Sequence, residues 1–132
     1  MKKLTNYLYY VSMITIAIWI AYTKGWILAD FEMIKPTQAI SLIKNDKNIT
    51  ILDVRENDEY KSGHIHKSIH IPLDKLEANL NKLPKDKKIL VYCRSGNRSI
   101  TASRILKSKG YTPIDIKDGI IGLASNGMRI EK

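Results

Sequence analysis

The chain has 132 residues, a formal net charge of +9 and one cysteine. One cysteine excludes an intramolecular disulfide, and the residues that follow the apolar N-terminal stretch are enough for one domain with one core. The lysines are scattered and no basic patch is interleaved with aromatic residues. The charge therefore predicts a solvated, positively biased surface and not a nucleic-acid-binding protein.

The chain begins with an apolar segment, residues 4–23, that carries no charged side chain. A helix of about 20 apolar residues spans a bilayer core, and the tyrosines and Trp26 near its ends are typical of a membrane interface. We expect a retained membrane anchor in residues 1–30, followed by a domain in residues 31–132. A cleaved signal peptide is the alternative, although no Ala-x-Ala cleavage signal is present, and a buried helix is a third interpretation.

The charges that flank this segment predict its orientation. Lys2 and Lys3 precede it, whereas Lys24 is soon followed by Asp30 and Glu32. Because positive charge tends to stay in the cytoplasm, we expect a single-pass membrane protein with its domain on the periplasmic or extracellular side. If the segment is cleaved, the same reasoning predicts secretion to the periplasm.

The rest of the chain alternates between two hydrophobic patterns. Residues 31–35 read as a linker. Short apolar runs predict strands at 49–54, 68–71, 88–92 and 113–117, and helical spacing predicts helices at 36–45, 57–61, 73–82, 98–109 and 119–126. Strands that alternate with helices indicate an α/β fold with a parallel sheet flanked by helices, here preceded by one transmembrane helix.

The single cysteine lies where the strand 88–92 turns into the helix 98–109. Free backbone N–H groups and the positive end of a helix dipole favour an anion at such a turn. If the Cys93 sulfur lies at its centre, the nucleophilic thiolate is favoured over the thiol. The alternative, a small buried hydrophobic cysteine, fits poorly with a turn that also contains two arginines and a glycine.

Residues 93–99, Cys-Arg-Ser-Gly-Asn-Arg-Ser, resemble the active-site loop of single-domain rhodaneses, which are sulfurtransferases. Residues 52–60, Leu-Asp-Val-Arg-Glu-Asn-Asp-Glu-Tyr, resemble a second segment of that family. Gly63-His64-Ile65, residues 69–73 and a glycine-containing C-terminal segment follow at similar spacing, so the resemblance covers about residues 33–131. It implies the three-layer rhodanese fold, with its parallel sheet between helices.

The sequence departs from the family pattern at several turn positions. Lys67 and Asp118 stand where the family commonly has glycine, Leu123 stands at the usual tryptophan, and Arg129 stands at the usual proline. None of these positions is the nucleophile. We expect them to affect local turn geometry and the packing of the last helix, and not the chemistry.

Two other functions share this fold, and both remain open at this point. Cysteine phosphatases hold five residues between cysteine and arginine, whereas Cys93 and Arg98 are separated by four, and the residue six after Cys93 is Ser99. The shorter loop suits the smaller sulfur of a persulfide. A non-catalytic rhodanese-like binding module at the membrane is the other alternative, although inactive modules usually lack the cysteine that this chain retains.

The resemblance implies that Cys93 is the catalytic nucleophile. It would take a sulfane sulfur from an anionic donor such as thiosulfate and pass it, as a persulfide, to a thiol or another nucleophile. The expected substrate-binding residues are Arg94, Ser95, Gly96, Asn97, Arg98, Ser99 and Arg55. For Arg55 we favour an internal ion pair with Glu56 or Glu59 that fixes the fold over a direct role in binding a substrate anion.

Three histidines, His64, His66 and His70, fall within seven residues and raise the question of a metal. Alternate residues of an extended segment share a face, but a metal site also requires a fixed geometry and further ligands. We expect no metal and no other cofactor, and structural or surface roles for all three side chains.

Overall fold

Five parallel strands form one sheet in the computed structural model, which describes residues 1–132, and their order is β1-β5-β4-β2-β3. The strands are β1 Glu32–Ile34, β2 Ile49–Asp53, β3 Ile69–His70, β4 Lys88–Tyr92 and β5 Thr112–Ile116. The central strand β4 pairs with β2 on one side and β5 on the other. The predicted parallel α/β fold is confirmed.

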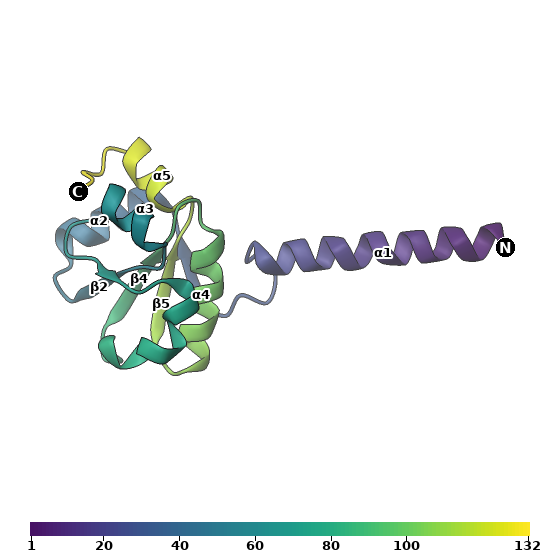
Figure 1. Ribbon diagram of the computed structural model, residues 1–132, viewed down its shortest axis with the longest axis horizontal. Coiled ribbons are helices and arrows are strands. Elements are labelled where there is room, and N and C mark those ends of the chain that lie inside the picture. Colours follow the sequence, from purple (N-terminus) through teal and green to yellow (C-terminus); the bar gives the residue numbers. More distant parts are fainter.

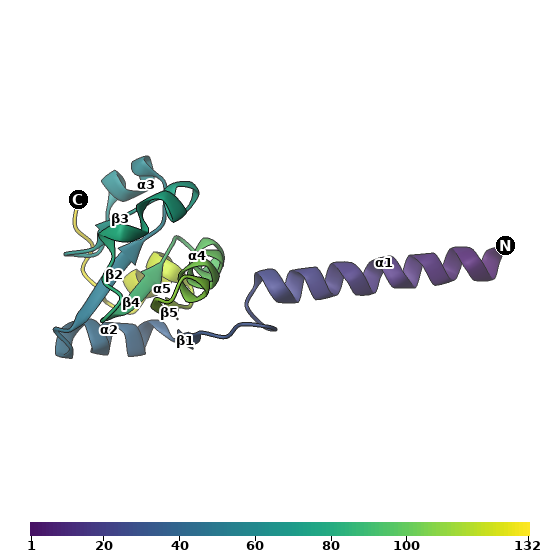
Figure 2. The same cartoon turned by 90° about the horizontal axis from the view of Figure 1, so that it is seen from below.

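Helices cover both faces of the sheet (Figures 1 and 2). They are α2 Pro36–Asn45, α3 Asn57–Ser62, α4 Asn97–Ser108 and α5 Gly119–Ser125, with two 3₁₀ segments, η1 Leu73–Lys75 and η2 Glu77–Lys82. Apolar side chains of α4, η1 and η2 pack on one face, and those of α2 and α5 pack on the other. The domain therefore has three layers.

Strand β4 shows how the sequence divides between the two cores. Ile89 and Val91 point into the cluster beneath α4, whereas Leu90 and Tyr92 point into the cluster beneath α2 and α5. All four residues are buried, because a central parallel strand is covered on both faces. This strand ends at the cysteine turn, so it carries Cys93 to the carboxyl edge of the sheet.

Two predicted boundaries were wrong. The stretch 31–35 is not a simple linker, because Glu32–Ile34 forms the edge strand β1 and pairs in parallel with β5. A three-residue strand is too short to show a periodic pattern. The single helix predicted at 73–82 is two 3₁₀ segments, and the backbone of Asn79 inside the second one is not helical.

The two turn positions at which the rhodanese family commonly has glycine have a left-handed backbone in this chain, although neither is glycine. Lys67 has φ +64° and Asp118 has φ +63°. A side chain in this region costs about 1–2 kcal/mol, which the surrounding contacts must offset. The departures from the family pattern therefore leave these turns in place at a cost in stability.

The N-terminal helix α1, Lys2–Thr23, extends away from the domain as a separate rod (Figure 1). None of its residues is buried against the domain, and it is long and apolar enough to cross a membrane. A signal sequence has the same length and composition, so the helix suits either role.

Arg104 of α4 holds the chain that leaves α1. Its guanidinium donates hydrogen bonds to the carbonyl oxygens of Tyr22, Ile27 and Leu28, at 2.6, 3.2 and 2.6 Å. It also lies 3.9 Å from the centre of the Tyr22 ring, a cation–π contact. Together with a 3.0 Å bond from Lys24 to Asn97, these contacts join the end of α1 to α4.

Candidate active site

Cys93 lies at the floor of the turn between β4 and α4, and only 1% of its surface is exposed. Its sulfur accepts a hydrogen bond from the backbone N–H of Gly96 at 3.1 Å and lies 3.6 Å from the Ser99 hydroxyl. Gly96 has φ +102°, a conformation that glycine adopts without strain and that turns its N–H toward the sulfur. The helix begins at the next residue, so the sulfur faces the N-terminal end of α4.

The start of α5 holds the outer side of this loop. The carbonyl oxygens of Cys93 and Arg94 accept hydrogen bonds from Ile120 and Ile121, at 2.8 and 3.2 Å. Gly119 precedes them with φ +54°, and a Cβ atom there would collide with both carbonyl groups. These hydrogen bonds hold the loop against the start of α5, and the Gly96 N–H is the backbone donor that meets the Cys93 sulfur.

Arg98, the second arginine of the loop, already has a partner. Its two terminal nitrogens donate to the two carboxylate oxygens of Glu59, at 2.6 and 2.9 Å. The arginine holds the pKa of Glu59 well below its usual range, at about 2. Arg98 therefore joins the loop to α3, and its charge is neutralised by a carboxylate in this conformation.

Arg94 differs from Arg98, because its guanidinium is exposed and forms no ion pair or hydrogen bond within the chain. It borders a hollow of about 450 Å³ that Glu59 and Arg55 also line. Ser95 and Asn97 border a second cavity, of about 430 Å³, on another side of the loop. Of the predicted loop residues, Gly96 and Ser99 lie next to the Cys93 sulfur, Arg98 is paired with Glu59, and Arg94 is the unpaired cation.

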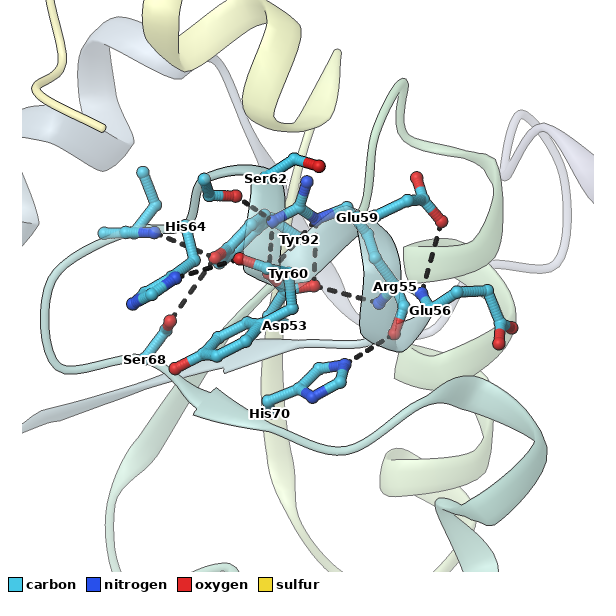
Figure 3. Close-up of polar contacts among 12 residues, drawn as sticks. Asp53, Arg55, Glu56, Glu59, Tyr60, Ser62, His64, Ser68, His70 and Tyr92 are labelled. Atoms are coloured by element: carbon cyan, nitrogen blue, oxygen red, sulfur yellow. Dashed lines mark hydrogen bonds and ion pairs between the residues drawn. The ribbon is translucent and has the colours of Figure 1, made fainter. Parts of the chain in front are cut away.

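Arg55 lies in a buried polar cluster next to the loop (Figure 3). Its guanidinium donates to both carboxylate oxygens of Asp53, the shortest contact being 2.7 Å, and to the carbonyl of Gly63 at 2.6 Å. The predicted internal ion pair exists, but its partner is Asp53 and not Glu56 or Glu59. The sequence contained a signal for this partner, because Asp53 ends a buried strand, where a carboxylate is costly without a counterion.

Three aromatic rings stack beside this ion pair (Figure 3). Tyr60 lies between His64 and His70, with ring centres 3.9 and 4.4 Å away and nearly parallel planes. His64 and His70 also contact the carbonyl oxygens of Tyr60 and Arg55 at 3.0 and 2.7 Å. The stack and its hydrogen bonds place both histidines in the scaffold that supports the 53–56 segment.

The third histidine lies apart from the stack. His66 is exposed and is 2.6 Å from Glu131. The His, Cys, Asp and Glu side chains form no group of three or more that could hold a metal ion. His64 and His70 thus share the Tyr60 stack, whereas His66 contacts Glu131.

The sequence analysis also missed Asp115 on β5. This residue is fully buried and neither of its carboxylate oxygens has a hydrogen-bond partner. Burial raises the pKa of Asp115 to about 6. The sequence feature that could have revealed it is an acidic residue between Ile114 and Ile116, two apolar residues of a predicted strand.

The sequence profile of the Rhodanese-like domain family matches residues 35–123, which include the strand, loop and helix described above. The chain belongs to this family. The rhodanese-related protein of Thermoplasma volcanium has the same fold, with a TM-score of 0.71 and 34% identity over 76% of this chain and 98% of that one.

Curated relatives of this rhodanese-like chain include sulfurtransferases. The thiosulfate sulfurtransferase GlpE of Coxiella burnetii is 32% identical over 84 residues, which cover 64% of this chain and 78% of GlpE. YrkF of Bacillus subtilis is 39% identical over 72 residues, which cover 54% of this chain and 39% of YrkF. The chain thus spans well under half the length of YrkF and most of the length of GlpE.

Proposed function

We propose that this rhodanese-like protein is a sulfurtransferase that carries a sulfane sulfur on Cys93. The observation that carries the proposal is the placement of the only cysteine. Its sulfur accepts the Gly96 N–H at the floor of a four-residue loop that ends at Arg98. A sulfur anion bound at this position is stabilised by the Gly96 N–H and by the N-terminal end of α4.

The transfer has two steps. The Cys93 thiolate attacks the outer sulfur of a donor such as thiosulfate; a sulfur–sulfur bond forms, and sulfite leaves with the electron pair of the bond that breaks. A thiol or another nucleophile then takes the outer sulfur and the Cys93 thiolate leaves. Because the chain has no second cysteine, the persulfide is discharged by an external acceptor.

Arg94 is the cation that attracts an anionic donor in this proposal. Its side chain is free, it belongs to the loop, and it borders the 450 Å³ hollow. Arg98 joins the loop to α3 through Glu59, and Arg55, paired with Asp53, borders the same hollow as Arg94. The GlpE relative, named as a thiosulfate sulfurtransferase, supports thiosulfate as the first donor to test.

We also propose that α1 anchors this activity to a membrane. Its large apolar side chains are exposed, and no part of the domain covers them. A bilayer would bury these side chains, and the tyrosines and Trp26 near the two ends of the helix suit its interfaces.

Intact mass measurement tests the sulfurtransferase proposal. Purified protein treated with thiosulfate should gain one sulfur atom, about 32 Da, and reductant should remove it. Cys93→Ser should gain nothing. An unmodified wild-type protein after exposure to thiosulfate, an organic trisulfide and a small-molecule persulfide would overturn the proposal.

A further inference from the structure

The cavity of about 430 Å³ beside the cysteine loop lies where the chain that leaves α1 meets the domain. Its walls come from residues 24–26, from β1, from the loop and the start of α4, and from the end of β5. Cys93 does not line it. Ligand pockets have volumes of roughly 300–1,000 Å³, so the cavity has room for a small molecule that does not touch the reacting sulfur.

The wall on the α1 side is packed against the domain. Gly25 is buried, and a Cβ atom on it would lie 3.2 Å from side-chain atoms of both Met33 and Ile100. The Lys24 ammonium group donates a hydrogen bond to the side-chain oxygen of Asn97 at 3.0 Å. These contacts hold residues 24–26 beside the start of α4 (Figures 1 and 2), so the cavity exists only in the full chain.

Asp115 is the buried polar residue of this cavity. It is in register with Val91 of β4, which belongs to the cluster beneath α4, so its side chain lies on the α4 side of the sheet. Its exposed fraction is zero, and neither carboxylate oxygen has a hydrogen-bond partner in the chain. A buried carboxylate without a partner is costly, and hydrogen-bond donors on a bound ligand would offset that cost.

The charged residues that line the cavity have both signs. They are two acids and two lysines, whose formal charges cancel: Asp115, Asp118, Lys24 and Lys117. None of the four forms an ion pair within the chain. A simple cation would meet two lysines here and a simple anion would meet the buried carboxylate, whereas a molecule with both charges can pair with each sign. Burial raises the pKa of Asp115 to about 6, so this group is mostly ionised at pH 7.5.

We propose that this cavity is a second binding site, for a small zwitterion that carries an ammonium group and a carboxylate, as free amino acids do. The ammonium group donates hydrogen bonds to the carboxylate oxygens of Asp115. The carboxylate of the ligand pairs with Lys24 and Lys117. Met33 and Ile100, the apolar side chains of the cavity, meet the carbon atoms between the two charges.

Gly96 connects this site with the cysteine loop. It lines the cavity, and its N–H donates the 3.1 Å hydrogen bond to the Cys93 sulfur. A ligand in the cavity therefore lies against the residue that holds the sulfur without reaching the sulfur itself. The backbone signal of Gly96 reports binding whether or not any sulfur is transferred.

Two-dimensional ¹H–¹⁵N NMR spectra of the full chain in detergent at pH 7.5 test the proposal. The probes are L-alanine and γ-aminobutyrate, which hold the two charges at a short and at a longer separation. We expect at least one of them to shift the signals of Gly25, Gly96 and Ile100 in a saturable way. Ethylamine and propionate, or n-propylamine and butyrate, each lack one charge of the matching probe. They should bind about tenfold more weakly or worse, because hydrogen bonds to charged groups are the strong ones.

Variants test the two ends of the ligand separately. Asp115→Asn removes the charge but keeps the shape of the side chain, so it should weaken binding of the zwitterion about tenfold or more. Lys117→Met should weaken the zwitterion and leave the matching amine unaffected. Asp74→Asn and Lys87→Met, at exposed positions outside the cavity, are the matched controls and should keep the wild-type affinity.

The outcomes separate this site from the proposed sulfur transfer. No saturable shift with either probe, or an unchanged affinity in Asp115→Asn, would overturn the proposal even if thiosulfate loads Cys93. Amines that bind as tightly as the zwitterions would also overturn it. Saturable binding that Asp115→Asn and Lys117→Met both weaken supports the site even if no donor loads the protein. Unchanged signals far from the cavity show that each variant is folded.

Discussion

Arg98 and Glu59 form a two-point ion pair beside the cysteine, although 39 residues separate them in the chain. Their oxygen–nitrogen distances are 2.6 and 2.9 Å, and Gly96, two residues before Arg98, donates its N–H to the Cys93 sulfur. The arginine that closes the loop therefore carries its own counterion. Arg94 is the arginine of the loop that has no such counterion.

Replacement of Arg94 by alanine should weaken the use of thiosulfate. A hydrogen bond to a charged group is worth about 1.5–3 kcal/mol, so kcat/KM for thiosulfate should fall roughly ten- to a hundredfold. An uncharged organic trisulfide should lose much less. Arg129→Ala, an exposed arginine outside the loop, is the control and should change neither value. Equal losses with both donors would show that Arg94 supports the loop instead of binding the anion.

Replacement of Glu59 by glutamine should lower stability in a pH-dependent way. Because the folded-state pKa is about 2, below the usual 4.5, the pair stabilises the protein above about pH 4.5 and loses this effect as pH falls toward 2. Both side chains are partly exposed, so we expect a loss of about 1–2 kcal/mol at pH 7 in urea unfolding. The difference from wild type should shrink toward pH 2.5; a constant difference would contradict the ion-pair explanation.

Breaking the buried ion pair of Asp53 and Arg55 should lower stability more than breaking the pair of Arg98 and Glu59. Arg55→Met leaves the Asp53 carboxylate buried without a counterion, and breaking such a pair costs about 3–5 kcal/mol. The double change with Asp53→Asn should cost less than the sum of the two single changes, as measured by urea unfolding. Lys82→Met, at an exposed lysine, should cost almost nothing. Additive losses would show that the two side chains act independently.

The left-handed turn at Lys67 predicts a stabilising substitution. Lys67→Gly removes the strain of a side chain at φ +64°. Glycine also raises the entropy of the unfolded chain, which offsets part of this gain. We expect a net increase in the free energy of unfolding of about 0.5–1 kcal/mol. Lys47→Gly, at an exposed position with ordinary φ, should instead be neutral or destabilising. The melting temperatures of both variants, measured by thermal unfolding, test this prediction. A Lys67→Gly variant that is less stable than wild type would mean that the lysine side chain makes stabilising contacts of its own.

The topology of α1 can be tested in a bacterial host. We expect a C-terminal alkaline phosphatase fusion to be active and a cytoplasmic reporter fusion to be inactive, because Lys2 and Lys3 favour a cytoplasmic N-terminus. The full-length mass should persist in the membrane fraction. A shortened soluble product would identify a signal sequence, and an active cytoplasmic reporter would show the opposite orientation.

The fold was predictable because its strands and helices carry clear periodic patterns. The run 88–92 is apolar on both sides, as a central strand must be, and the loop residues follow it directly. The edge strand β1 was missed because three residues show no period, and it forms only by pairing with β5, about 80 residues later. A strand this short forms because a neighbouring strand pairs with it, and its own residues carry too little pattern to predict it.

The polar partners in the site were harder to predict than its nucleophile. Cys93 is unique in the sequence and lies at a recognisable turn, but Glu59 meets Arg98 only because α3 lies against the loop. Asp53 and Asp115 occupy strands whose apolar neighbours favour burial, and nothing in the order of residues shows that one has a counterion while the other has none. Ion-pair partners in this site are set by how the helices and strands pack together, which the order of residues alone does not show.

The Arg104 contacts limit how far the domain can move from the end of α1. The eight residues 24–31 could extend to about 25 Å as a free tether, but Arg104 binds three carbonyl groups in and beside this stretch and removes most of that slack. Arg104 is seven residues along α4 from Asn97, a rise of only about 10 Å. The domain is therefore held close to the end of α1, and under the proposed function an acceptor for the sulfur on Cys93 would have to approach the domain there.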